Sequence, residues 1–237
     1  MVAAGGDQYD YDTNCNSANL AGHCRVFAYD VGLADWVQRG TDIRGGAAGD
    51  KMGLGIAINA DGTVLACGAP YSDVQASNGG EVQVYEYNAA SDEWELIGAP
   101  IYGTVSKQWL GFNVALNAAG NILAVGSPGT NTLSNDGAVA VYQRVDDAWV
   151  LLGSAIEGNA YGNANNNYCG KSVDLDETGY ILAVSCSHGS PGTVEIFHYN
   201  SDDNAWGLQA TIDEVESSSR FGASRRSKRR GRSPQPD

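Results

Sequence analysis

Short apolar segments alternate along the chain with short polar segments that are rich in glycine, asparagine and aspartate. This pattern suits short β-strands joined by tight turns better than it suits helices. Both faces of the predicted strands are expected to be covered, because adjacent as well as alternate positions are apolar in segments such as ILAVGSP (122–128) and AVAVYQR (138–144). Small sheets stacked face to face would provide that cover.

A repeat organises most of the sequence, and four of the five tryptophans mark it. They are spaced by 58, 55 and 57 residues: Trp36, Trp94, Trp149 and Trp206. Each one precedes an apolar segment such as WELIGAPIYG (94–103). A fixed period of this size is typical of repeat architectures such as solenoids and propellers.

Each repeat unit contains three further segments upstream of its tryptophan. One is similar to GEVQVYEYN (80–88), and the other two form a continuous stretch such as GFNVALNAAGNILAVGSP (111–128). That stretch begins at glycines spaced by 58 and 59 residues: Gly53, Gly111 and Gly170. A glycine closing a short polar run within it predicts a tight antiparallel hairpin with one left-handed residue. Each unit therefore offers four short strands.

Four-stranded units stacked around an axis make a β-propeller, so the predicted fold is all-β with about four blades. We expect repeat units at 1–45, 46–103, 104–158 and 159–216, the start of another strand at 217–224, and a disordered basic tail at 225–237. The first unit lacks its first strand, because VAAGG (2–6) matches the second-strand segment LACGA (65–69). Two explanations remain open: a closed four-blade ring, or a fragment of a larger ring, which we favour.

The stretch GLGIAINADGTVLACGAP (53–70) and its copy at 111–128 resemble the FG-GAP repeats of the integrin α-chain propeller. The resemblance covers roughly residues 1–222. It implies a seven-bladed ring, calcium loops in some blades, protein or ligand binding on one face, and a cell-surface or extracellular location. No signal peptide or membrane-spanning helix is expected from the sequence itself.

No cofactor is expected, because the calcium loops of the family are absent. The turns at Asn59–Gly62 and Asp174–Glu177 have room for a hairpin and little else, whereas Ca²⁺ takes 6 to 8 oxygen ligands. Asp174 and Asp176 are expected on one face of a strand, as solvated turn residues. No metal site is predicted.

No enzyme is predicted either, although a propeller hydrolase or lyase stays a remote alternative. A nucleophile needs an activating base, and none of the three histidines has such a context. His23 and His198 lie in repeated strands and are expected at an edge or surface, and His188 lies in a loop.

Four of the five cysteines occupy apolar slots of the repeat and are expected to act as small core side chains: Cys24, Cys67, Cys169 and Cys186. Cys15 alone lies in a loop. The spacing gives no sign of a disulfide framework, although a Cys15–Cys24 bridge is an open alternative.

Aromatic and polar residues in the connecting loops are the candidate binding site, because propellers bind through these loops. The predicted residues are Tyr71, Asp73, Tyr102, Trp109 and Tyr161. Packing against a neighbouring blade is the alternative role for their side chains. The expected function is non-enzymatic recognition of a protein or glycan ligand, and the alternative is a scaffold segment of a larger repeat protein.

Charge narrows the class of partner. The net charge is −14, but the tail at 225–237 holds six of the fourteen basic residues, which leaves 8 basic and 27 acidic residues in 1–224. A body with a net charge of −19 would repel nucleic acid and anionic lipid. Open strand edges at both ends of the array predict self-association.

Overall fold

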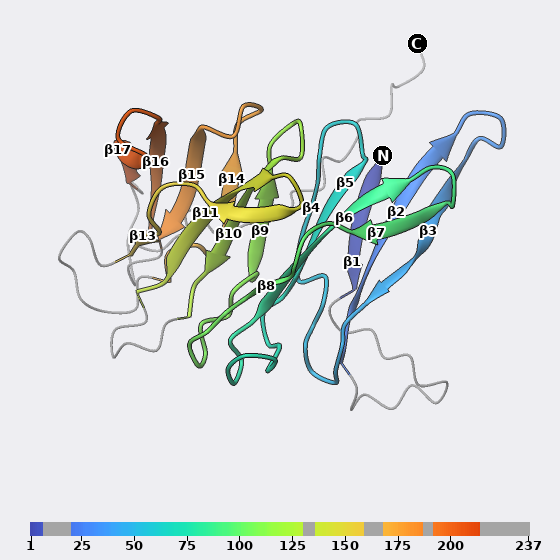
Figure 1. The fold of residues 1–237 in the computed structure, drawn as a ribbon, viewed down its shortest axis with the longest axis horizontal. Helices are drawn as coiled ribbons and strands as arrows, with labels where there is room; N and C mark the ends of the chain where they lie inside the picture. The colour runs from blue at the N-terminus through green and yellow to red at the C-terminus, as the bar shows by residue number, and fades with distance from the viewer. Residues whose placement is uncertain (7–19, 130–135, 159–167, 187–191, 214–237) are drawn as a thin grey trace, which may run out of the picture.

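The computed structural model of the chain describes residues 1–6, 20–129, 136–158, 168–186 and 192–213. These residues form strands and loops only, in four antiparallel sheets that stand side by side in a row (Figure 1). The all-β, propeller-like prediction is confirmed, and each sheet is one blade. The described segments include no helix with the length and apolarity to cross a membrane.

Each blade is a meander whose successive long strands pair antiparallel. Blade 1 contains β1 (Val2–Gly6), β2 (His23–Asp30) and β3 (Asp35–Arg44). Blade 2 contains β4 (Gly55–Ile58), β5 (Val64–Ala69), β6 (Glu81–Asn88), β7 (Glu93–Leu96) and the short β8 (Ile101–Tyr102). Blade 3 contains β9 (Asn113–Leu116), β10 (Ile122–Ser127), β11 (Ala138–Val145), β12 (Ala148–Leu151) and the short β13 (Ile156–Glu157). Blade 4 contains β14 (Val173–Leu175), β15 (Ile181–Cys186), β16 (Thr193–Asn200) and β17 (Ala205–Asp213).

Blade 1 begins with what is the second strand of the other blades. Val2 of β1 pairs with Phe27, in the same register in which Leu65 pairs with Tyr85 in blade 2. Among the described residues, blade 1 therefore has three strands and the innermost one is missing, as the sequence predicts. The predicted strand start at 217–224 and the basic tail lie outside the described residues.

A glycine with positive φ closes each inner hairpin, as predicted: Gly62, Gly120 and Gly179. The polar side chain three residues before that glycine holds the turn. In blade 2, Asn59 Oδ1 accepts the N–H groups of Thr63 and Val64, both at 2.9 Å. Asn117 and Asp176 occupy the same position in blades 3 and 4. Such side-chain caps satisfy backbone donors that the turn leaves unpaired.

The pairing of Asp174 and Asp176 on one strand face is wrong, because β14 ends at Leu175. Asp176 lies in the turn, where its Oδ1 accepts N–H groups of Gly179, Tyr180 and Ile181 at 2.9–3.0 Å. Partial burial works to raise the pKa of Asp176, but these bonds and one from Thr178 outweigh it and lower the pKa. The Asp176 carboxylate therefore stabilises the turn.

The hydrophobic core lies in the three seams between neighbouring blades. We call the face of a blade that meets the next blade its front face, and the opposite face its back face. At the second seam, Val64, Ala66 and Val84 of the front face of blade 2 pack against Leu123 and Val125 of the back face of blade 3. The first and third seams are built from residues in equivalent positions. Stacking therefore covers both sheet faces, which explains the doubly apolar strands.

The repeated tryptophans fasten each blade to the preceding one. Trp94 Nε1 donates to the carbonyl of Arg39 at 2.9 Å. Trp149 and Trp206 make the same bond to Ile97 and Leu152, at 3.2 and 2.8 Å. The next residue of the preceding blade is a glycine at each of these three seams, and at Gly40 an added Cβ would lie 2.7 Å from Trp94. The repeat therefore reflects an interlocking contact between blades.

Among the described residues, backbone connections hold neighbouring blades together at one end of the first seam and at both ends of the second and third seams. At one end, the residue that begins a blade donates to the preceding blade, as when Met52 N–H bonds to Ala21 at 2.8 Å. At the other end, the inner hairpins join, and Ala60 N–H bonds to the Ala118 carbonyl at 3.2 Å. Ala118 N–H continues this line to Glu177 at 3.1 Å.

The four cysteines expected to act as small core side chains also form two disulfides, of which their spacing gave no sign. Cys24 is bonded to Cys67, across the seam between blades 1 and 2, and Cys169 is bonded to Cys186 within blade 4. The alternative Cys15–Cys24 disulfide is excluded, because Cys24 is bonded to Cys67. All four are fully buried in the core, as expected of apolar slots. Pairing follows because Cys24 lies on a front face and Cys67 on the back face that meets it.

Blades 1 and 4 lie at opposite ends of the long axis of the molecule (Figure 1). The described blades thus form an open row, and the closed four-blade ring is not seen in them. The predicted strand start at 217–224, whose pairing with blade 1 would close such a ring, lies outside the described residues.

Candidate binding face

The loops that lead into β4 and β9 lie at the lower end of the row in Figure 1, the end at which β14 also begins. The residue two before the first glycine of each of these blades has a positive φ: Lys51 (55°), Trp109 (54°) and Tyr168 (44°). A positive φ is uncommon for such residues and marks an imposed geometry. The backbone connection to the preceding blade follows at once in all three cases. Three blades therefore present a side chain from the same backbone position.

Trp109 connects blades 2 and 3 on this face. Its ring centroid lies 6.2 Å from that of Tyr71, with the planes tilted by 52°. On its other side it lies against Gly129 of its own blade, where an added Cβ would come within 2.8 Å of the indole. Lys51 places its Nζ 4.7 Å from the centroid of the Tyr71 ring, a cation–π contact. Each of these side chains remains partly exposed.

A small pocket continues the surface toward blade 4. It has a volume of about 130 Å³ and is lined by Trp109, Phe112, Pro128, Tyr168 and Lys171. We call the continuous set of partly exposed side chains the aromatic row: Lys51, Tyr71, Trp109, Phe112, Tyr168 and Lys171. The row crosses three blades.

The lysines of the chain are concentrated at this face. The sequence has four lysines, and the three that precede the tail are Lys51, Lys107 and Lys171. Two of them belong to the aromatic row, and Lys107 lies exposed two residues before Trp109. In a body with a net charge of −19, this end thus carries a local group of cations among aromatic rings.

Two buried carboxyl groups support the loops beneath the row. Asp50 Oδ2 accepts the Ala47 N–H at 2.7 Å, and burial raises the pKa of Asp50. The buried Glu81 Oε2 accepts a hydrogen bond from Ser72 Oγ at 3.0 Å. The Ala47 bond braces the loop that contains Asp50, and the Ser72 bond fastens its loop to β6.

The structure brings two of the five predicted binding residues together, Tyr71 and Trp109. Asp73 lies in the same loop, where its Oδ1 accepts the Asn78 N–H at 2.6 Å, so it shapes the loop. Tyr102 was predicted to lie in a loop, but it lies in β8, where it pairs with Glu81. Tyr161 lies outside the described residues.

Sequence reasoning missed four members of the row: Lys51, Phe112, Tyr168 and Lys171. The sequence could have indicated them through their offset, in residues, from the repeated glycines Gly53, Gly111 and Gly170. Residues at the same offset from a repeated glycine occupy the same place in each blade.

The described histidines differ in their exposure. His23 is buried, so its predicted surface position is wrong, and burial followed by the Arg25 charge lowers the pKa of His23. His198 is exposed, as predicted, and His188 lies outside the described residues. Within the described part of the chain, no three His, Cys, Asp or Glu side chains are close enough together to hold a metal ion.

Comparison with known proteins supports the fold alone. No family model matches the chain, and no curated protein is similar to it. Among solved structures, a 6-phosphogluconolactonase candidate from Bacteroides uniformis has a TM-score of 0.55 at 11% identity, covering 81% of this chain and 52% of its own. A hypothetical selenium-binding protein from Sulfolobus tokodaii has a TM-score of 0.52 at 11% identity, with 83% and 47% covered. The chain spans about half the length of these structures, and the FG-GAP resemblance stays a prediction.

Proposed function

We propose that this chain is a non-enzymatic recognition module that binds a segment of a partner protein along the aromatic row. The observation that carries the proposal is the position of Trp109, partly exposed and shared between two blades beside Tyr71. Tryptophan and tyrosine are enriched at the centres of protein interfaces, where they supply large contact area at low entropic cost.

The lysines suggest the chemistry of that segment. Lys51 and Lys171 stand at the two ends of the row, so an extended segment that carries carboxylates and apolar side chains would meet cations and rings in turn. Because the body repels acidic molecules at long range, this contact depends on short-range pairing. An oxidising compartment suits the encounter, since disulfides such as Cys24–Cys67 persist there.

Selection of random peptides displayed on phage would test this function. Selected peptides should bind the Trp109→Ala variant at least about tenfold more weakly than the unaltered chain, the loss expected for an interface anchor. Val150→Ser is the control, because Val150 is an exposed apolar residue of the outer strand β12, and its peptide binding should not change. Thermal melting would confirm that both variants are folded.

Peptides that bind Trp109→Ala with full affinity would contradict the site. Binding of a glycan array without any selected peptide would contradict a protein ligand, since sugars also stack on aromatic rings. Failure of both screens would favour the scaffold alternative.

A further inference from the structure

The two end faces of the row correspond in position to the two faces that meet at an internal seam. Blade 1 has a back face that meets no described blade, and blade 4 has a front face in the same situation (Figure 1). Each of the three internal seams joins a front face to a back face through equivalent residues. The exposed residues of the end faces can therefore be compared, position by position, with their buried counterparts.

The back face of blade 1 exposes residues that are buried in the other blades. Val2 is 45% exposed, whereas Leu182 in the equivalent position of blade 4 is 0% exposed. Trp36 is 48% exposed, whereas Trp94 is 9% exposed. Trp36 keeps its cross-strand partner Tyr29, with ring centroids 5.6 Å apart. At Val2 and Trp36 the face thus retains side chains that form a seam, and no described blade covers it.

The front face of blade 4 exposes the complementary set. Ile181 is 44% exposed, whereas Ile122 in the equivalent position of blade 3 is 2% exposed. Val194 and Ile196 are partly exposed, although their counterparts in blades 2 and 3 are fully buried. These positions receive the back face of the next blade at every internal seam.

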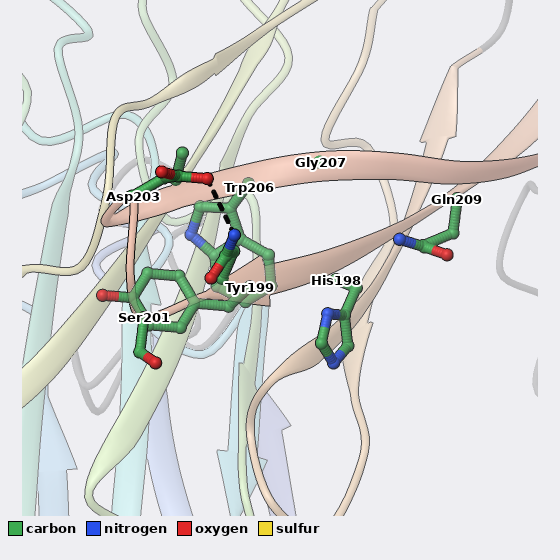
Figure 2. A pocket seen from close by; sticks show the side chains of 9 residues that line it. His198, Tyr199, Ser201, Asp203, Trp206, Gly207 and Gln209 are labelled. Atoms are coloured by element: carbon green, nitrogen blue, oxygen red, sulfur yellow. Dashed lines mark hydrogen bonds between the residues drawn. The ribbon is translucent and has the colours of Figure 1, made fainter.

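A hollow marks this front face. It has a volume of about 350 Å³ and is lined by Ile181, Ile196, His198 and Gln209. Gln209 lies at the position whose carbonyl accepts the tryptophan N–H at each internal seam. A neighbouring hollow of about 520 Å³ extends along the β16–β17 hairpin, where Figure 2 shows His198 and Gln209 on adjacent strands, near Gly207. Ala210 replaces the glycine of the internal seams. The incoming indole would therefore have to shift away from the Ala210 Cβ, because an added Cβ at Gly40 would lie 2.7 Å from Trp94.

We propose that a second copy of this chain covers these faces, with the back face of blade 1 of one copy seated on the front face of blade 4 of the other. Trp36 would enter the hollow at Gln209 as Trp94 enters the first seam. Repeating the contact at both ends closes two four-blade chains into one eight-blade ring with twofold symmetry. Eight blades lie within the range that propellers adopt, and head-to-tail interfaces give rings when they close.

A second copy is favoured because each end face finds its complement on the same chain. The Tyr29–Trp36 pair reproduces the pairs Tyr87–Trp94 and Tyr199–Trp206, which pack on front faces at the first and third seams. One chain cannot join its own faces, since they lie at opposite ends of its long axis (Figure 1).

Sedimentation velocity of the full chain over a hundredfold range of concentration tests the proposal. We expect a monomer of 24.8 kDa in equilibrium with a species of twice that mass, tightened by added salt because the acidic bodies repel. Trp36→Ala should raise the dissociation constant at least about tenfold. Val150→Ser, with 49% exposure on blade 3, should leave it unchanged.

Mixing two variants distinguishes head-to-tail pairing from other dimers. Trp36→Ala damages only the blade 1 face and Ile181→Glu only the blade 4 face, so each variant alone should be mostly monomeric at a concentration just above the dissociation constant of the unaltered chain. Their mixture should form dimers through the one seam that stays intact. A monomer at every concentration, a dimer of Ile181→Glu alone, or a ladder of larger species would overturn the eight-blade ring.

Discussion

Removal of the Cys24–Cys67 disulfide should uncouple blade 1 from the rest of the array. This bond closes a loop of 43 residues, which restricts the unfolded chain and corresponds to about 4 kcal/mol of stability in the chain-entropy model. The Cys169–Cys186 bond closes 17 residues and corresponds to about 3 kcal/mol. Because domains have total stabilities of only about 5 to 15 kcal/mol, the first loss is a large share.

The position of the bond adds a second effect. Blade 1 contacts blade 2 alone among the described blades, so repeat-like behaviour predicts that it can unfold while the other seams remain. Urea unfolding of the Cys24→Ala/Cys67→Ala variant should therefore show an early transition that the unaltered chain lacks. The Cys169→Ala/Cys186→Ala variant is the matched control, with a smaller loss and no early separation of blade 1.

Thiol counting gives the refuting result. The chain has five cysteines, so two disulfides leave one thiol to titrate in urea without reductant. Five reactive thiols, or equal urea midpoints for the unaltered chain and the Cys24→Ala/Cys67→Ala variant, would show that the bond does not form. The cysteines would then be apolar core side chains only.

Three further perturbations test the seams and the pairing within blade 1. Trp94→Ala should cost about 3 to 5 kcal/mol in urea unfolding, because a buried ring and its hydrogen bond are lost together. Gly68→Ala should lower the melting temperature, because its Cβ would collide with the Gly111 backbone of the next blade. The hydrogen bond from Arg25 holds the pKa of Asp42 down to about 2, so Asp42→Asn should cost about 1 to 2 kcal/mol at neutral pH. That difference is fully present above about pH 4 and should vanish as pH falls through 2, which acid titration of both proteins would check.

The repeat made the strands predictable. Val26, Val84 and Val141 share one position in the sequence pattern and one buried position in the structure, because a repeat gives each copy the same neighbours. The missing strand of blade 1 followed from the same alignment.

The residue pairs that meet across a seam were harder to predict from the sequence. Aligning Cys24 with valines and Cys67 with other valines shows that both positions are apolar, but not that one column faces the other. That relation depends on which strand face meets the next blade. The aromatic row was found only in part for a related reason, since Lys51 and Tyr168 differ in chemistry from Trp109 while sharing its backbone position.

The paired backbone connections at the two ends of a seam have a geometric consequence. A sheet that is bonded to its neighbour at one end only can change its tilt, whereas a sheet that is bonded at both ends keeps it. At the second and third seams the inner hairpins also join, so main-chain hydrogen bonds set the angle between the blades there. Side chains then pack in the space that this angle leaves. Core substitutions there should change stability while leaving the curvature of the row, and with it the number of blades that completes a circle, as it is. The first seam has no hairpin bond among the described residues, so its angle depends on other contacts across it, such as the hydrogen bonds from Gly40 and Thr41 to Asp92 and Glu93.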